Sequence, residues 1–165
     1  MFLYDNMEVS MLKKSAGILV YKIEDNIPKV LLSHFGGPFW EGIDKGGWSI
    51  PKGELTHDEK ILDAAKREFK EETNLDIDSK LHYLGSKKVS HKKLAIIFYA
   101  LKDFDLGKCK SNTFKLEYPN GSGKYCNFPE MDKYEWMDIP KAKEMIIANQ
   151  LYFINKFEDV LNGYK

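Results

Sequence analysis

Three glutamates, Glu68, Glu71 and Glu72, are spaced so that a helix would carry them on one side. At about 100° per residue, they fall within an arc of roughly 100°. Carboxylates this close repel one another, whereas a solvated helix gains more from opposite charges four residues apart. Such a cluster is tolerable when a hard divalent cation neutralises it, and Mg²⁺ prefers oxygen ligands of this kind. The cluster therefore predicts a metal site.

Three neighbouring residues fit this chemistry. Gly53 precedes the helix, and glycine lets the backbone approach closely enough to offer a carbonyl oxygen. Arg67 stands four residues before Glu71 and can hold its carboxylate in a bidentate pair. Lys52 adds positive charge where phosphate oxygens would lie. Because Mg²⁺ usually keeps waters and binds substrate phosphates, the predicted reaction is attack of water at phosphorus.

The ordinary alternative is a solvated helix rich in lysine and glutamate, which many soluble proteins contain. Three clustered glutamates alone do not separate the two interpretations. The full spacing does, because six fixed residues at about one in fifteen each coincide by chance with a probability on the order of 10⁻⁷ per start position. The six are Gly53, Glu59, Arg67, Glu68, Glu71 and Glu72.

The elements that must position these residues are predicted from periodicity. Apolar runs at 15–23 and 28–34, separated by a turn-forming segment, predict a β-hairpin. A loop rich in glycine and aromatics is expected at 35–47, followed by a strand at 47–50. Thr56-His57-Asp58-Glu59 has the form of a capping box, so the helix should begin near His57.

The remaining pattern completes the fold prediction. Leu62, Ala65 and Phe69 should pack the helix on the sheet. Strands are expected at 81–89 and 94–101, and residues 102–133 show few strong patterns. A short strand at Tyr134–Met137 and helical sequence from Pro140 onward close the chain. A mixed sheet between helices follows, which is an α/β sandwich.

Composition limits the class of protein. The chain has 165 residues with 25 basic and 25 acidic side chains, which predicts one domain and argues against binding to an extended nucleic acid. Cys109 and Cys126 are too few for a disulfide scaffold, so a reducing, cytoplasmic location is expected. No apolar run reaches the roughly 18 residues that cross a bilayer. Residues 1–10 lack the pattern of a signal peptide, and residues 1–14 are expected to form an N-terminal extension before a domain at 15–165.

The spacing resembles the Nudix hydrolase box, G-x5-E-x7-R-E-U-x-E-E-x-G-U, where U is bulky and apolar. The matching residues are Gly53, Glu59, Arg67, Glu68, Phe69, Glu71, Glu72 and Leu75. Asn74 stands where the family has glycine; it is the next best residue for a left-handed helix end, so the departure should cost some stability and leave activity intact. From Ser15 onward, segments such as SAGILVY, WSIPKGE and FPEMD are similar to a bacterial-type subgroup of nucleotide pyrophosphohydrolases.

The resemblance implies an α/β/α sandwich, dependence on Mg²⁺ or Mn²⁺, and hydrolysis of a nucleoside diphosphate linked to another group. It implies metal ligation by Glu68, Glu71, Glu72 and the carbonyl near Lys52-Gly53, with Arg67 and Glu59 as orienting residues; capping is an equal alternative for Glu59. Glu130, six residues before Trp136, matches a loop glutamate that serves many members as an extra ligand or general base. Glu117 is a rival for that role, and a surface position is the alternative for both.

The substrate is less constrained by the residues. The proline expected past the box in ADP-ribose hydrolases is absent, since Ser90 stands there, and the form W-x-x-P-K-G is similar to diadenosine tetraphosphate hydrolases. Phe39, Trp40 and Tyr99 could stack a base, although Phe39 and Trp40 could equally plug the core. Lys87, Lys93 and their basic neighbours could hold a longer phosphate chain, or simply be solvated. The leading hypothesis is a nucleoside or dinucleoside polyphosphate hydrolase, monomeric or dimeric; the alternatives are a nucleoside triphosphate pyrophosphatase and a non-catalytic nucleotide-binding module.

Overall fold

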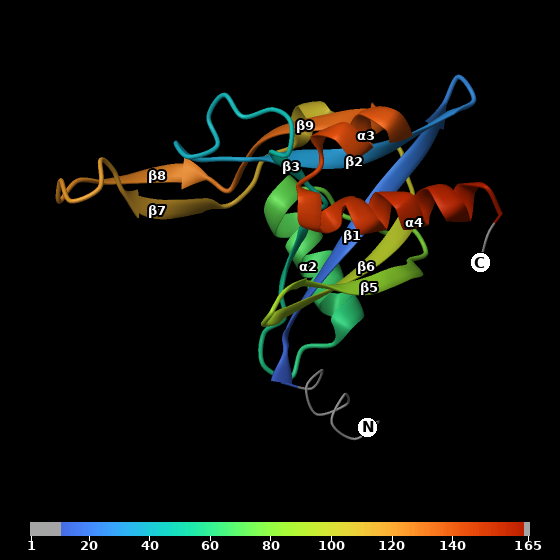
Figure 1. Cartoon of the computed structure of the whole chain (residues 1–165), viewed down its shortest axis with the longest axis horizontal. Helices are drawn as coiled ribbons and strands as arrows, with labels where there is room; N and C mark the ends of the chain where they lie inside the picture. Colours follow the sequence, from blue (N-terminus) through green and yellow to red (C-terminus); the bar gives the residue numbers. More distant parts are fainter. Residues whose placement is uncertain (1–10, 164–165) are drawn as a thin grey trace.

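The structure is a computed structural model that describes residues 11–163, and in it a mixed β-sheet lies between helices (Figure 1). The predicted hairpin forms strands β1 (Lys13–Glu24) and β2 (Ile27–Phe35). Asp25 and Asn26 join them with φ of 51° and 63°. A tight two-residue hairpin turn requires this left-handed backbone, which aspartate and asparagine tolerate. Residues 1–10 of the expected N-terminal extension lie outside the described residues.

The sheet has the order β3–β2–β1–β6–β5, with β4 paired to β1 and β9 paired to β2. The further strands are β3 (Trp48–Ser49), β4 (Lys52–Glu54), β5 (His82–Ser90), β6 (Lys93–Leu101) and β9 (Met131–Asp138). β1 and β6 run parallel, and β1 also pairs antiparallel with β2 and β4. The predicted strands at 81–89 and 94–101 are confirmed within one residue at each end, and the strand predicted at Tyr134–Met137 is longer than expected.

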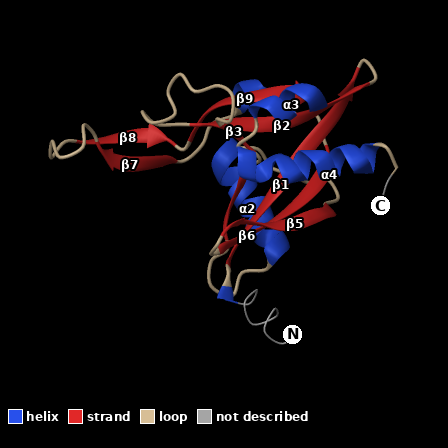
Figure 2. Ribbon diagram, viewed as in Figure 1, coloured by secondary structure: helices blue, strands red, loops and turns tan. Residues whose placement is uncertain are grey.

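Helices cover both faces of the sheet, which makes the sandwich (Figure 2). Helix α2 (Ile61–Thr73) packs through Ala65 and Phe69 against Ile18 and Val20 of β1. On the other face, Leu19 joins a core that includes Phe153 and Phe157 of α4 (Leu151–Leu161). Because successive residues of β1 are buried on opposite faces, its sequence is a continuous apolar run instead of an alternating one. The predicted α/β sandwich is confirmed.

Helix α2 begins four residues later than predicted. Its first residue is Ile61, because Asp58 adopts a left-handed backbone with φ of 60° that interrupts a helix. Glu59 still accepts hydrogen bonds from the Thr56 backbone N–H and hydroxyl, so half of the capping box survives as a turn. The prediction that Leu62 packs on the sheet is wrong, since it is exposed, and Ala64 is buried beside Ala65 instead.

The C-terminal region contains α3 (Ile139–Met145), a 3₁₀ turn η2 (Ala148–Gln150) and α4. Pro140 lies in the first turn of α3 as predicted, and the Asp138 side chain caps that turn by accepting from the Lys141 N–H at 3.0 Å. Within residues 11–163, no helix is long and apolar enough to cross a membrane.

The segment 102–133 has more order than its sequence indicated. It contains a 3₁₀ turn η1 (Leu106–Lys108) and a separate hairpin of β7 (Thr113–Glu117) and β8 (Tyr125–Pro129). This hairpin projects away from the sandwich (Figure 1). Its strands carry charged residues and a proline, so their apolar–polar periodicity is weak. The alternation of side chains can be recognised only in the structure, where the 36–47 loop covers one side of the hairpin.

Candidate active site

The second half of α2 lies against β4, and this contact creates the site. Gly53 on β4 pairs with Ala16 of β1, which holds its backbone in the sheet. A Cβ added at Gly53 would stand 2.0 Å from the Glu68 carboxylate oxygen Oε2. Glycine is therefore required here by close approach of a carboxylate, because any side chain would displace Glu68.

Glu72 is the most buried carboxylate of the cluster, with 6% of its surface exposed. Its Oε2 accepts a hydrogen bond from the Lys52 backbone N–H at 3.2 Å. Burial, followed by the negative charge of Glu68, raises the pKa of Glu72 well above its ordinary value. A buried carboxylate with a single backbone donor is costly for the fold, which is typical of a functional position.

Arg67 is the cation that neutralises the cluster in this structure. Its Nε and Nη2 donate to the two carboxylate oxygens of Glu59 at 2.7 and 3.0 Å. Its Nη1 donates to Glu68 at 2.7 Å and to both oxygens of Glu71 at 3.2 and 3.1 Å. The predicted contact with Glu71 forms, but the two-nitrogen bidentate pair is made with Glu59. Glu59 therefore orients Arg67, in addition to its bonds with Thr56.

Glu130 joins the cluster from the segment between β8 and β9. Its backbone N–H donates to the Asn112 carbonyl, and the Asn112 N–H donates to the Glu71 carbonyl, both at 2.9 Å. These bonds fasten the Glu130 segment to the end of α2. Partial desolvation, followed by the negative charge of Glu71, raises the pKa of Glu130, although the residue remains largely exposed to solvent. Burial likewise raises the pKa of Glu68, and the charges of Glu71 and Glu130 add to the rise.

The donor set fits a hard divalent cation. Carboxylates of Glu68, Glu71, Glu72 and Glu130 act on one another electrostatically beside the Gly53 backbone. Four anions with one arginine leave excess negative charge, which oxygen-preferring Mg²⁺ or Mn²⁺ would offset. Within residues 11–163, no three acidic, histidine or cysteine side chains already stand arranged around an ion position, and Glu68 and Glu71 contact Arg67 instead.

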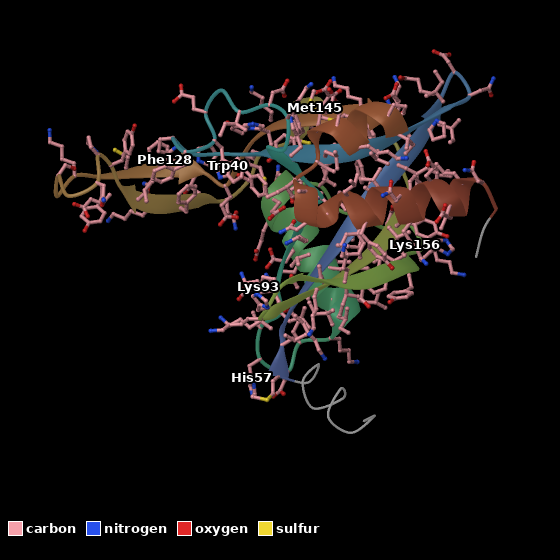
Figure 3. The ribbon with its side chains drawn as sticks, in the orientation of Figure 1. Trp40, His57, Lys93, Phe128, Met145 and Lys156 are labelled. Atoms are coloured by element: carbon pink, nitrogen blue, oxygen red, sulfur yellow. The ribbon has the colours of Figure 1, made fainter. Side chains whose placement is uncertain are left out.

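Two of the predicted basic residues lie beside the carboxylates. Burial lowers the pKa of Lys52, and the charges of Glu72 and Glu68 oppose that change. Lys93, near the β5–β6 turn in Figure 3, forms an ion pair with Glu54 of β4 at 2.9 Å. Lys52 and Lys93 act on each other electrostatically and so form a cationic edge at β4, and Lys52 joins this edge to the carboxylate cluster.

Other predicted residues are not brought to the carboxylates. The Lys87 ammonium lies 5.1 Å from the ring centre of Tyr152 on α4, on the face of the sheet opposite α2. Tyr99 also packs in the α4 core, so its expected place near the site is wrong. The Glu117 carboxylate accepts from the Gly123 N–H at 2.9 Å and holds the far turn of the hairpin. Glu130, and not Glu117, therefore lies beside α2.

The aromatics of the loop at 36–47 are not core residues. Trp40 packs on Phe35 with ring centres 4.6 Å apart, and Phe39 is 67% exposed. Phe39 therefore stands at the surface and Trp40 is partly buried, in a loop whose Gly37 and Pro38 line a groove together with Phe128 of the projecting hairpin. This position leaves them accessible to a ligand, and a role in plugging the core is excluded for Phe39.

Two buried polar residues hold the loops around the site, a role that the sequence did not indicate for either. His34 is 2% exposed, and its Nδ1 lies 2.6 Å from an Asp132 oxygen while its Nε2 lies 2.5 Å from the Ile43 carbonyl oxygen. The ring thus ties the 36–47 loop to the strand that follows Glu130. The only signal was a histidine inside an apolar strand. Gln150 accepts from the Ile50 N–H at 2.8 Å and had no sequence signal.

The fold and the site together define a Nudix domain. A model of the NUDIX domain matches residues 11–157, and the chain therefore belongs to this family. The residues that match the hydrolase box run from Gly53 on β4 through α2 to Leu75.

Solved structures with similar folds come from several organisms. An Ap4A hydrolase of C. elegans is similar with a TM-score of 0.68 and 20% identity, covering 93% of this chain and 100% of that one. A MutT protein of Methanosarcina mazei Go1 gives 0.61 and 21% identity, covering 91% and 95%. The NUDIX domain of Shewanella oneidensis NrtR, complexed with ADP ribose, gives 0.64 and 16% identity, covering 91% and 88%. These likenesses show the fold.

Among curated proteins, the m7GpppN-mRNA hydrolase of Saccharomyces cerevisiae is 25% identical over 136 residues, which is 79% of this chain. The match spans only 11% of that relative's length.

Proposed function

We propose that this enzyme hydrolyses a phosphoanhydride bond in a nucleoside or dinucleoside polyphosphate, of which diadenosine tetraphosphate is the leading candidate. The observation that carries the proposal is the pairing of an anionic cluster with a cationic edge. Glu68, Glu71, Glu72 and Glu130 gather beside Gly53, and Lys52 and Lys93 border them. Such a substrate contains several adjacent phosphates, which need both divalent cations and lysines. The fold of the C. elegans Ap4A hydrolase supports the choice.

The residues that would hold Mg²⁺ or Mn²⁺ are Glu68, Glu71, Glu72, Glu130 and the Gly53 carbonyl. When bound, the cation would lower the pKa of a ligated water and neutralise phosphate oxygens. Arg67, held by Glu59, keeps Glu68 and Glu71 oriented. Lys52 offers positive charge to a phosphate oxygen.

Glu130 is the carboxylate best suited to receive a proton from the attacking water. Its pKa is raised, which makes it a stronger base than an ordinary glutamate. Its segment is fixed to α2 by the bonds through Asn112, so its position relative to Glu71 is defined. Its exposure leaves room for water to reach it.

The test is a panel of nucleoside triphosphates, dinucleoside polyphosphates and ADP-ribose, assayed with Mg²⁺, with Mn²⁺ and with chelator. We expect turnover of polyphosphates only with metal. Glu130→Gln should reduce kcat by about 10²–10⁴-fold, the range for loss of a general base, and Glu71→Gln should remove most activity. Glu117→Gln, the same change at the rival glutamate, should retain activity.

The panel also separates the alternatives. Preference for simple triphosphates would favour a nucleoside triphosphate pyrophosphatase. Tight binding of a nucleotide with no turnover of any member would favour a non-catalytic module and would sink the proposed reaction.

A further inference from the structure

A groove of about 520 Å³ lies between the 36–47 loop and the β7–β8 hairpin, outside the carboxylate cluster. Its lining includes Pro38, Glu41, Tyr118, Cys126, Phe128 and Asp132. One wall is the loop and the other is the hairpin. The strands of this hairpin contribute no carboxylate to the cluster, so the cluster does not account for the hairpin. The groove is therefore distinct from the carboxylate cluster.

The hairpin presents an aromatic side to this groove. Phe128 meets Phe114 with ring centres 6.0 Å apart and Tyr118 at 6.1 Å in an edge-to-face arrangement. The loop backbone lies directly on this side, since a Cβ at Gly37 would stand 2.9 Å from Phe114 Cζ. Tyr125 points to the other side of the hairpin, because β8 alternates and Phe128 and Cys126 take the groove side. The hairpin wall of the groove is thus rich in ring surface.

The charges in the groove select the kind of ligand. Its lining contains two carboxylates, Glu41 and Asp132, and no lysine or arginine. It would repel a phosphate, whereas Lys52 and Lys93 lie on the β4 side of the cluster. A flat heterocycle that donates hydrogen bonds is complementary to aromatic walls with acceptor carboxylates. A nucleobase with an exocyclic amine has this chemistry.

The groove and the site are adjacent along the chain. Pro129 lines the groove, and the next residue is Glu130 of the carboxylate cluster. Cys126 lies three strand positions before Pro129, so the groove extends about 10 Å along β8 and ends one residue before Glu130. A nucleotide can therefore place its base in the groove and its phosphates at the cluster and cationic edge.

We propose that this groove binds an amine-bearing nucleobase of the substrate, with the base against Tyr118 and Phe128 and its amine donating to Glu41. The inference rests on the proposed function, because it supplies the base subsite for that reaction. It makes the β7–β8 hairpin the element that recognises the nucleoside.

The test measures binding to the metal-free protein, so it does not need turnover. The ligands are AMP, IMP, which has a carbonyl in place of the adenine amine, and ribose 5-phosphate, which lacks the base. The wild type should bind AMP more tightly than IMP, and ribose 5-phosphate weakest. Tyr118→Leu should weaken the binding of AMP about tenfold, which is within the range of base–aromatic stacking. Glu41→Gln should remove the preference for AMP over IMP.

Tyr125→Leu is the matched control, because it makes the same change on the opposite side of the same hairpin and should leave all affinities within about twofold. Glu41 lies in the exposed loop, so Glu41→Gln keeps the test valid if Tyr118→Leu disturbs the hairpin. Equal affinity of the wild type for AMP and ribose 5-phosphate would overturn the inference. So would unchanged AMP binding in both groove variants.

The two proposals fail in different ways. If the enzyme turns over the nucleotide panel but the base adds nothing to binding, the base-binding role of the groove is rejected and the proposed hydrolysis stands. If AMP, IMP and ribose 5-phosphate bind in the expected order but no nucleotide is hydrolysed, the base-binding role of the groove is supported and the proposed hydrolysis is rejected.

Discussion

Arg67 and Glu59 form a bidentate ion pair eight residues apart, with Nε 2.7 Å from Oε1 and Nη2 3.0 Å from Oε2. This fork leaves Nη1 to reach Glu68 and Glu71. Glu59 lies just before α2 and thereby fixes a guanidinium in the middle of the helix. Glu59 thus acts on Glu68 and Glu71 through Arg67.

This pair predicts a specific acid sensitivity. The hydrogen bonds from Arg67 lower the pKa of Glu59 to about 2, from an ordinary value of 4.5. A carboxylate with a lowered folded pKa stabilises the fold fully above its unfolded pKa and loses that contribution as pH falls toward 2. Glu59→Gln should therefore show a shallower fall of Tm between pH 4.5 and pH 2 than the wild type. Parallel curves in thermal melts over this range would contradict the prediction.

Gly53→Ala should separate activity from stability. The three atoms nearest the new Cβ all belong to the Glu68 carboxylate, the end of a flexible side chain, so the fold can adjust while Glu68 is displaced. We expect kcat to fall about 10²-fold, the effect of a misplacement near 1 Å, with little change in Tm.

Gly17→Ala, on the neighbouring strand β1, should have the opposite effect to Gly53→Ala: a loss of stability. There the Cβ would lie 2.5 Å from the Pro51 carbonyl oxygen, which is backbone. This variant should lose about 1–3 kcal/mol of stability in chemical denaturation, as overpacked sites do. A Gly53→Ala enzyme with full kcat would remove Glu68 from the site.

Burial of Glu72 predicts a gain in stability when its charge is removed. Glu72→Gln keeps the shape and an acceptor for the Lys52 N–H, and it removes a charge buried near Glu68. In chelator at pH 8, the variant should be more stable by about 1 kcal/mol, or about 2–4 °C in Tm. Added Mg²⁺ should raise the Tm of the wild type more than that of the variant. An equal Mg²⁺ response in both would count against Glu72 as a ligand.

Asn74→Gly tests the departure from the family box. Asn74 ends α2 with φ of 63°, and its N–H donates to the Lys70 carbonyl at 2.8 Å. Glycine adopts this conformation without the steric cost of a side chain, so the variant should gain about 0.5 kcal/mol after its greater unfolded-state entropy is deducted. Activity should be unchanged. Steady-state kinetics and urea titration measure the two effects, and a rise in kcat would show that Asn74 limits the reaction.

Gln150→Leu should loosen the strand that precedes Lys52. The Gln150 carbonyl accepts from the Ile50 N–H at 2.8 Å, and its amide donates to the Ser49 hydroxyl at 2.9 Å. The variant leaves a buried N–H without a partner and should lose about 1–3 kcal/mol. Asn149→Leu, at the exposed neighbour, should cost less than about 0.5 kcal/mol. Similar losses in both variants would show that packing of η2, and not this bond, holds the strand.

The sequence was most informative where one local pattern decided the structure. The Asp25-Asn26 turn, the apolar runs of β1 and β2, and the left-handed end at Asn74 were all predictable, because backbone preference and burial agree there. The start of α2 was misplaced because a capping pattern is shared by helices and turns. Asp58 decided between them through a backbone conformation that its residue type only permits.

The sequence predicted which residues form the candidate site but not the contacts between them. Clustered glutamates on α2 were visible from their spacing, but pairing of Arg67 with Glu59 depends on the turn that carries Glu59 back over the helix. The separation of Lys87 from Lys93 depends on their positions along the β5–β6 pair: Lys87 lies opposite Ala95 and beside Tyr152, whereas Lys93 starts β6 and pairs with Glu54. The roles of His34 and Gln150 involve partners about 100 residues away, at sequence separations of 98 and 100. Local pattern contains no information on such contacts.

The β7–β8 hairpin is closed at its base by the hydrogen bond from the Glu130 N–H to the Asn112 carbonyl at 2.9 Å. The chain therefore leaves the sandwich and returns to it at nearly the same point. A loop closed in this way can be lengthened, shortened or exchanged during evolution without shifting α2 or the sheet. New specificities can then be acquired by changing one module while the hydrolytic machinery is inherited intact.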